Sequence, residues 1–371
     1  MKSERKIVTL GAIARFSSGG TPSKKSDKYW NGNIPWISAK TLKSEKITTS
    51  DLFISEDGLK SGSKIAPAGS ILMLTRGSGL FNGIPISIAE SDVAYNQDIK
   101  CIEACADVSN KFIFYWLKSQ QNYLLAKVEM TGIGAGKFDT DFLKNLTISL
   151  PEPRERDAIV SIIDDISEKI ELNKKINKNL EQQAQAIYSR MFIEHRQESW
   201  STGQLSDLIS VKYGKDHKKL ADGNYPVYGS GGIMRYVEKP LYTGESVLIP
   251  RKGTLNNVMY VSEAFWSVDT MFYTEMLHPN IAKFVYHFVK SKDLASLNAG
   301  SAVPSMTTNI LNAMQLYIPD EKTLEKFENI VSPMYSAMQE NTKESKILAN
   351  TRDTLLPKLM SGELDVSDID L

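Results

Sequence analysis

The sequence predicts an α+β protein, with two similar mixed α/β domains separated by two long helices that form an antiparallel coiled coil. Three observations lead to this prediction. The chain of 371 residues repeats itself at a nearly constant offset, each copy ends in a long heptad-patterned segment, and short β-prone runs bounded by Gly or Pro precede each of those segments. This length exceeds one typical core and suits two globular parts with connectors.

The internal repeat is clearest in the second part of each copy. Residues 145–151 align with residues 313–319, and the same offset places Ile159 on Phe327 and Leu180 on Leu348. Residues 111–119 resemble residues 283–291. Residues 69–76 resemble residues 244–251, which pairs Arg76 with Arg251. The order is therefore globular segment, helix, globular segment, helix, with expected bounds of 1–152, 153–196, 197–319 and 320–371.

The two helical segments carry a sustained heptad pattern. About forty residues after Pro153 contain no Gly or Pro, and the second copy has Pro333 early in it. Apolar side chains recur in steps of four and three, as in a coiled-coil seam. The residues expected between the helices are Ile159, Ile163, Ile166, Ile170, Asn173, Leu180 and Ile187 in the first copy and Val331, Met334, Met338, Asn341, Leu348 and Leu355 in the second.

The orientation and pairing of these helices are further inferences. Asn173 and Asn341 interrupt the two seams at matching places, and a polar seam residue can fix the register of a coiled coil. Two unrelated amphipathic surface helices are the alternative, which the shared offset and shared polar interruption disfavour. We expect antiparallel pairing, because parallel helices would crowd both globular segments at one end. A helix of about 38 residues spans roughly 57 Å.

The globular segments contain the expected strands and shorter helices. Runs at residues 70–75, 146–150 and 247–250 are short, β-prone and bounded by Gly or Pro, which predicts strands. Residues 111–127 and 281–298 have helical periodicity. Each globular segment is thus expected to be a mixed α+β domain with many Gly-rich loops.

Composition and motifs argue against catalysis, metal binding and membrane insertion. Cys101 and Cys105 are too few for a disulfide framework, and the four histidines lack metal-ligand spacing. Residues 132–138 resemble a phosphate-binding loop but have Phe138 where Ser or Thr is required. No run approaches the roughly 20 apolar residues of a membrane span, and the charged residues 1–6 do not resemble a signal peptide. We expect a cytoplasmic, non-catalytic protein without a metal site.

The charge distribution favours DNA as the ligand of the globular segments. The whole chain has 44 basic and 44 acidic residues. Residues 1–150 and 201–318 together carry 30 Lys and Arg against 23 Asp and Glu, whereas the remaining residues carry 14 against 21. Lys and Arg in flexible loops are suited to phosphate contacts. The candidate DNA-binding residues are Lys24, Lys25, Lys40, Arg76 and Lys137 in the first globular segment and Lys215, Lys218, Lys219, Tyr228, Arg235, Arg251 and Lys252 in the second.

Arg76 and Arg251 are the favoured pair of contacts. Each ends an expected strand before a Gly-bearing loop. A structural ion pair that holds the loop is the alternative for both arginines. Packing within the protein is the alternative for Tyr228.

At this point the chain resembles a known family, the specificity subunits of type I restriction-modification systems. Residues 180–187, LEQQAQAI, and residues 351–364, TRDTLLPKLMSGEL, carry the resemblance, which extends over residues 6–366. It implies that each globular segment, as a target-recognition domain, recognises one half of a bipartite DNA target while the helices span the unread spacer. It also implies binding of two methyltransferase subunits and of motor-nuclease subunits. S-adenosylmethionine, ATP and Mg²⁺ would be bound by those partners, and no cofactor by this chain.

Two other interpretations stay open at the level of sequence. The same architecture could serve a system that only methylates DNA. A coiled-coil scaffold that binds proteins instead of DNA would have the same helices without a DNA-binding face.

Overall fold

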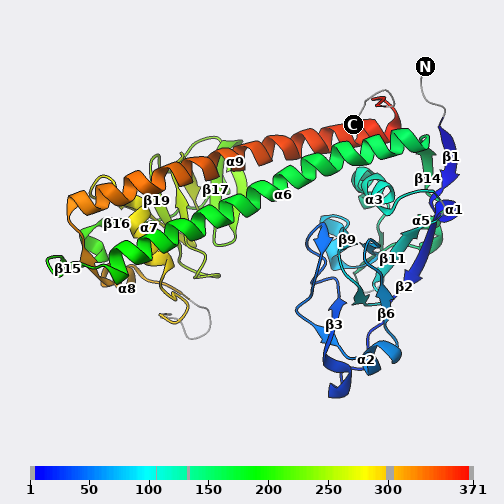
Figure 1. The fold of residues 1–371 in the computed structure, drawn as a ribbon, viewed down its shortest axis with the longest axis horizontal. Helices are drawn as coiled ribbons and strands as arrows, with labels where there is room; N and C mark the ends of the chain where they lie inside the picture. The colour runs from blue at the N-terminus through cyan, green and yellow to red at the C-terminus, as the bar shows by residue number, and fades with distance from the viewer. Residues whose placement is uncertain (1–4, 106, 132–133, 298–304, 367–371) are drawn as a thin grey trace. The chain divides into compact units, whose positions relative to one another are not determined.

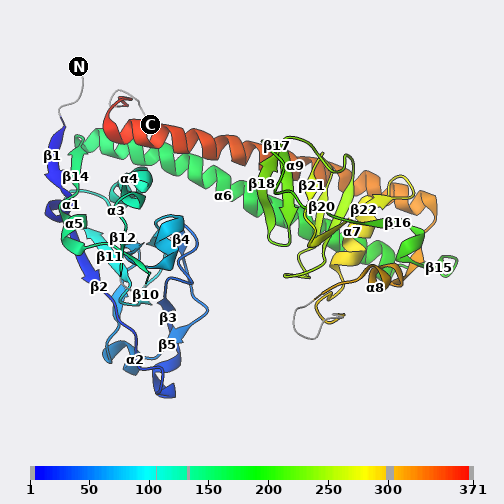
Figure 2. The same ribbon diagram turned by 180° about the vertical axis from the view of Figure 1, so that it is seen from behind.

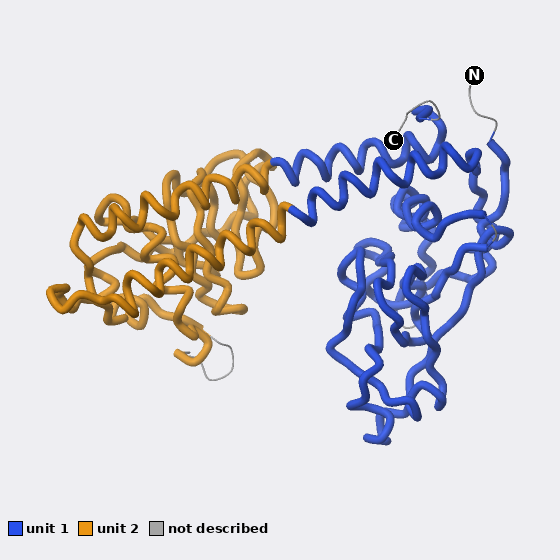
Figure 3. Tube along the Cα trace, in the orientation of Figure 1, with its two compact units in different colours: residues 1–172, 344–371 blue, residues 173–343 orange. Residues whose placement is uncertain are grey.

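The computed structural model describes residues 5–105, 107–131, 134–297 and 305–366 and forms two compact units (Figures 1 and 3). Unit 1 comprises residues 1–172 and 344–371, and unit 2 comprises residues 173–343. Each unit therefore contains one globular segment together with a length of both long helices, whereas the sequence had suggested the helices as separate parts. In the described ranges, no helix has both the length and the apolar character needed to cross a membrane.

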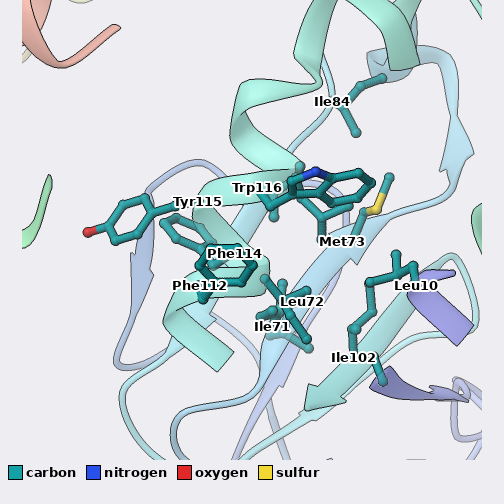
Figure 4. Packing of buried hydrophobic residues seen from close by; sticks show 14 of the residues in the cluster. Leu10, Ile71, Leu72, Met73, Ile84, Ile102, Phe112, Phe114, Tyr115 and Trp116 are labelled. Atoms are coloured by element: carbon teal, nitrogen blue, oxygen red, sulfur yellow. The ribbon is translucent and has the colours of Figure 1, made fainter. Parts of the chain in front are cut away.

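Unit 1 is built on a five-stranded sheet with the order β2-β11-β7-β9-β4. These strands are β2 (Ala14–Ser18), β11 (Ile99–Ala104), β7 (Ile71–Leu74), β9 (Ile86–Ala89) and β4 (Lys46–Ile47). Helix α3 (Asn110–Ser119) covers the sheet, and the Ser109 hydroxyl caps it by accepting from the Phe112 N–H at 3.1 Å. Figure 4 shows Phe112 and Trp116 facing β7 while Tyr115 extends away from it. This apolar layer forms the core of the unit.

Smaller sheets complete unit 1. A four-stranded sheet has the order β5-β3-β10-β6, a three-stranded sheet has the order β12-β13-β8, and β1 pairs with β14. These strands are β5 (Phe53–Ile54), β3 (Trp30–Ile37), β10 (Val93–Tyr95), β6 (Lys64–Ala66), β12 (Glu129–Met130), β13 (Gly136–Lys137), β8 (Arg76–Gly77), β1 (Lys6–Thr9) and β14 (Thr147–Leu150). The short helices are α1 (Leu10–Ile13), η1 (Asp27–Tyr29), α2 (Glu56–Lys60), η2 (Ser78–Asn82), α4 (Gln121–Leu125) and α5 (Thr140–Lys144).

Among the described residues, unit 2 repeats this plan with fewer strands than unit 1 (Figure 2). One sheet has the order β16-β22-β19-β20, a second has the order β18-β17-β21, and β15 pairs with β23. These strands are β16 (Ile209–Tyr213), β22 (Met271–Met276), β19 (Ser246–Pro250), β20 (Met259–Val261), β18 (Gly232–Val237), β17 (Asp222–Gly229), β21 (Trp266–Ser267), β15 (Ser201–Gln204) and β23 (Gln315–Ile318). The helices are η4 (Leu205–Asp207), α7 (Ala282–Lys290) and α8 (Thr308–Asn312).

The expected short helices are shorter in the structure than the periodicity suggested. The segment 111–127 divides into α3 and α4, because the backbone leaves the helical region at Gln120. In the segment 281–298, α7 ends at Lys290. Apolar periodicity continues past both helix ends, so it marks the buried face but not the point where the helix stops.

The long helices are α6 (Pro153–Ser189), followed by a π-helical turn at Arg190–Glu194, and α9 (Glu321–Ser361). They form the predicted antiparallel pair, with contacts inside each unit. In unit 1, Lys169 lies 3.4 Å from Glu344. In unit 2, the Asn341 amide donates to Asn177 Oδ1 at 2.9 Å. Among the expected seam residues, Ile159, Ile163, Ile170, Asn173 and Val331 are buried, and Ile166, Leu180, Ile187, Met334, Met338, Asn341, Leu348 and Leu355 are half-buried.

Candidate nucleic-acid interface

Several loops of unit 1 meet at one end of its central sheet. We define the first loop cluster as residues 19–25, 38–43, 75–77, 96–98 and 136–137. Backbone hydrogen bonds join its members: the Thr75 N–H donates to the Asp98 carbonyl at 2.8 Å, and the Phe138 N–H donates to the Thr75 carbonyl at 2.9 Å. The Asn96 N–H donates to the Ile37 carbonyl at 3.0 Å, at the end of β3. The cluster is thus held by the sheet that it caps.

The first of these loops requires glycine where it leaves β2. A Cβ atom on Gly19 would lie 2.0 Å from the Tyr95 carbonyl oxygen, so no other residue permits this approach. The next residue, Gly20, donates its N–H to the Tyr95 carbonyl at 2.9 Å and accepts the Trp36 indole N–H at 3.1 Å. These contacts fix the start of the loop that carries Lys24 and Lys25.

Two cations face each other across neighbouring strands of the first loop cluster. Arg76 on β8 is the cross-strand partner of Lys137 on β13, and both residues are exposed. Glu129 lies opposite Lys137 on its other side. Within the described part of the chain, neither cation forms an ion pair. Like charges at directly opposed positions repel each other, so an anion such as a phosphate would stabilise this pair.

Unit 2 has a corresponding set of loops, which we define as the second loop cluster: residues 214–219, 229–232, 251–253, 268–270 and 305–306. Gly214 occupies the place of Gly19, since its Cβ would lie 2.0 Å from the Val268 carbonyl oxygen. Lys215 donates its N–H to the Ser267 carbonyl at 2.8 Å and accepts the Trp266 indole N–H at 2.8 Å. The same bond therefore exists in both units, with the tryptophan on β3 in unit 1 and on β21 in unit 2.

Strand register corrects the sequence alignment of Arg76 with Arg251. Leu74 pairs with Ile99 in unit 1, and Pro250 pairs with Met271 in unit 2, which places Arg251 in the position of Thr75. Lys252 accordingly forms an antiparallel backbone β-bridge with Ser305, just as Arg76 pairs with Lys137 across two strands. The comparison by sequence was therefore shifted by one residue. A cation still occupies this position in both units, Arg76 in unit 1 and Lys252 in unit 2, and both side chains are exposed.

Two candidate arginines of unit 2 make side-chain contacts within the protein. The Arg235 guanidinium donates to the Leu220 carbonyl at 2.9 Å and to Asp222 at 2.8 Å. Arg251 donates to the Asp269 carbonyl at 3.2 Å and lies over the Tyr213 ring. These contacts hold loop segments together, and Arg251 does so through a carbonyl hydrogen bond in place of the ion pair considered above.

Tyr228 is half-buried, and its hydroxyl lies 3.4 Å from Glu263. Burial, reinforced by the nearby carboxylate, raises the pKa of this hydroxyl well above its ordinary value. The side chain packs edge-on against Phe265. The remaining candidates are all exposed: Lys24, Lys25 and Lys40 in unit 1 and Lys215, Lys218 and Lys219 in unit 2.

Sequence reasoning missed the polar residues at the turns that join the central strands. Gln97 is exposed between β10 and β11, and the Thr21 hydroxyl donates to its Oε1 at 2.7 Å. Asp269 is exposed at the corresponding turn of unit 2. The polar run at residues 96–98 between two β-prone segments was the available signal. Across the described ranges, no group of three or more His, Cys, Asp or Glu residues could hold a metal ion.

Comparisons with known proteins match most of this duplicated architecture. The model of a family described as the type I restriction modification DNA specificity domain matches residues 2–182 and again residues 197–348. The chain is 23% identical to the type I restriction enzyme MjaIX specificity subunit of Methanocaldococcus jannaschii, over 98% of this chain and 94% of that protein. It is 33% identical to the EcoR124I/EcoR124II specificity subunit of Escherichia coli over 42% of this chain and 39% of that protein. The crystal structure of a type I restriction-modification S subunit from M. genitalium has the same fold, with a TM-score of 0.60, 19% identity and coverage of 96% of each chain.

Proposed function

Because this chain belongs to the family of type I restriction-modification DNA specificity subunits, we propose that its two loop clusters are the surfaces that contact DNA. The protein is a non-catalytic specificity subunit that recognises a bipartite target, with one unit for each half-site. It associates with other subunits of such a complex and with DNA.

The observation that carries the proposal is the duplication of one loop arrangement within the two matched regions. Each cluster places an exposed cation at the end of the central strand, Arg76 in unit 1 and Lys252 in unit 2, and each begins at a glycine packed against a backbone carbonyl. Exposed lysines and an arginine in such loops suit phosphate contacts, which position a protein on the duplex while neighbouring polar side chains contact the bases.

We further propose the composition of the complex and its location. Two methyltransferase subunits would bind, one to each repeat, and motor-nuclease subunits would join them. S-adenosylmethionine, ATP and Mg²⁺ would be held by those partners, and the complex would work in the cytoplasm. The repeat supports two equivalent docking positions, since α3 contacts the long helices in unit 1 as α7 does in unit 2. A neighbouring gene for a motor-nuclease would distinguish this system from one that only methylates.

Domain exchange tests the assignment of one half-site to each unit. Residues 201–318 lie wholly inside unit 2. In cells that co-express the methyltransferase subunit, replacing them by the matching segment of a relative should change one half of the methylated motif and leave the other half unchanged. Long-read sequencing that detects modified bases gives the result. A change in both halves would contradict the proposal.

A gel-shift assay with genomic fragments tests DNA binding directly. The chain with its methyltransferase subunit should retain DNA, and raising the salt concentration should weaken this retention. Failure to retain DNA, with or without the methyltransferase subunit, would favour a protein-binding scaffold.

A further inference from the structure

The turns that join the central strands hold different polar side chains at the same place in the two units. The Thr75 N–H donates to the Asp98 carbonyl in unit 1, and the Arg251 N–H donates to the Thr270 carbonyl in unit 2. Asp98 and Thr270 therefore correspond to each other. The residues just before them are Gln97 and Asp269, and both are exposed.

Gln97 is held in a conformation that leaves hydrogen-bonding capacity toward the outside. The Thr21 hydroxyl occupies one lone pair of its Oε1 at 2.7 Å. Its Nε2 lies 3.5 Å from Asp98 Oδ2, so at most one of the two amide hydrogens is engaged there. One lone pair of Oε1 and one N–H of Nε2 remain. Such a donor and acceptor pair matches N7 and the 6-amino group of adenine in the major groove.

The Asp269 side chain offers only hydrogen-bond acceptors, and the basic residues Arg251 and Lys252 contact the backbone around it. It precedes Thr270, whose carbonyl receives the N–H groups of both Arg251 and Lys252. The Arg251 guanidinium bonds to the main-chain carbonyl of Asp269. Within the described part of the chain, no side chain donates to the Asp269 carboxylate or forms an ion pair with it. A carboxylate next to DNA phosphates is repelled unless it accepts a hydrogen bond from a base, and the 4-amino group of cytosine provides that donor.

From this correspondence we propose that Gln97 and Asp269 are equivalent base-specifying residues, with Gln97 selecting adenine in the half-site of unit 1 and Asp269 selecting cytosine in the half-site of unit 2. The inference rests on the function proposed above, because it takes the loop clusters as the DNA-contacting surfaces. It adds the base chemistry that distinguishes the two half-sites.

Reciprocal substitutions test the proposal in the complex with the methyltransferase subunit. Gln97→Asp should change one adenine position to cytosine in one half of the methylated motif. Asp269→Gln should change one cytosine position to adenine in the other half. In competition binding, each variant should lower the preference for the original base by about 10- to 100-fold. Gln182→Ala, an exposed glutamine on α6, is the matched control and should leave the motif unchanged.

A base analogue tests Gln97 without relying on the new preference. Purine in place of the critical adenine lacks the 6-amino group, so it should weaken binding by the wild-type protein about tenfold and leave binding by Gln97→Ala unaffected. Equal losses in both proteins would overturn the assignment of Gln97. An unchanged motif in both reciprocal variants, or a loss of binding that is uniform across sequences, would overturn the inference while leaving the proposed function intact. Absence of any split motif for the wild-type protein would instead contradict the proposed function.

Discussion

Helices α3 and α7 occupy the same place in the two units, yet the lysine–carboxylate pairs that attach them to the long helices differ in burial. In unit 1, Lys111 on α3 pairs with Asp164 on α6 at 2.5 Å, and 53% of the lysine side chain is exposed. In unit 2, the corresponding Lys283 on α7 is only 6% exposed and contacts Glu328 at 2.6 Å and Glu245 at 2.8 Å. The repeat thus preserves the position of the helix and a lysine, while burial decides how much that lysine contributes to stability.

A second pair of equivalent residues, Tyr115 and His287, also differs in how deeply its polar contacts are buried. The Tyr115 hydroxyl on α3 donates to Asp164, whose side chain stays partly exposed. Its counterpart in the repeat is His287, which is fully buried between Gln185, 2.8 Å from Nδ1, and the Tyr335 hydroxyl, 2.9 Å from Nε2. A neutral imidazole satisfies both contacts by donating to the Gln185 oxygen and accepting from Tyr335. Unit 2 therefore depends on a polar network around a fully buried imidazole where unit 1 depends on a partly exposed one.

The largest expected effect comes from removing the buried lysine. Lys283→Met leaves Glu245 and Glu328 without their shared cation, which should lower the free energy of unfolding of unit 2 by about 3 kcal/mol. Scanning calorimetry of the full chain measures it. The matched variant Lys111→Met removes an exposed pair and should cost less than about 1 kcal/mol. Equal costs would show that burial does not separate the two attachments.

The next effect is a dependence of unit 2 on pH. Burial lowers the pKa of His287 from 6.5 to about 4. The unfolded chain therefore takes up a proton before the folded one as the pH falls. The stability associated with the neutral ring is present above about pH 6.5 and is lost progressively down to about pH 4, by at most about 3 kcal/mol.

Melting temperatures measured between pH 7 and pH 4.5 should show this loss in the wild-type protein. His287→Gln should reduce the stability at pH 7 but flatten the dependence of the unit 2 transition on pH. A slope as steep as that of the wild-type protein would assign the acid sensitivity to other groups.

A smaller effect concerns the equivalent cations of the two loop clusters. Arg76→Ala and Lys252→Ala should each weaken binding to all DNA sequences and reduce the salt dependence of the binding constant by about one unit. Fluorescence anisotropy at several salt concentrations measures both quantities. Arg251→Ala serves as the comparison, since its guanidinium is bonded to the Asp269 carbonyl and its effect on the salt slope should be smaller. If Arg251→Ala lowered the salt slope by a full unit and Lys252→Ala left it unchanged, Arg251 would be the functional counterpart of Arg76, as the sequence alignment suggests.

The smallest effect is expected at the two tryptophans. Trp36→Phe and Trp266→Phe each remove one indole donor from a loop carbonyl, of Gly20 and Lys215 respectively. Each substitution should cost about 1 kcal/mol, because a loop carbonyl loses its hydrogen-bond partner. Urea unfolding of the two variants, compared with the wild-type protein, gives the values. A marked difference between them would show that the two loops are not held alike.

The sequence could reveal the repeat and the helix pair because both depend on periodicity. The heptad positions from Ile159 to Ile170 recur at constant offset, and such a pattern depends only on which face of a helix is covered. The position of Arg76 could not be transferred in this way. The register of a strand is set by its cross-strand partners. The sequence alignment matches Arg76 with Arg251, but in the structure Lys252 occupies the place equivalent to Arg76.

The site itself was only partly predictable for the same reason. Exposed lysines such as Lys24 and Lys218 stand out by composition. The role of Gln97 depends on its contact with Thr21, which is 76 residues away, and on the turn that exposes it. A sequence alignment does not match Trp36 on β3 with Trp266 on β21, although both indole N–H groups donate to a loop carbonyl in the same way.

The contacts of Arg5, the residue before β1, have a consequence for how the chain folds during its synthesis. Arg5 donates to the carbonyls of Leu359, at 3.0 Å, and Met360, at 2.8 Å, and pairs with the buried Glu155. The residues that supply the two carbonyls are made some 355 residues after Arg5. Unit 2, which is continuous from 173 to 343, is synthesised in full before the last part of unit 1 exists. Folding during translation would therefore finish in the second unit first, and the contacts of Arg5 with α9 would be the last to form.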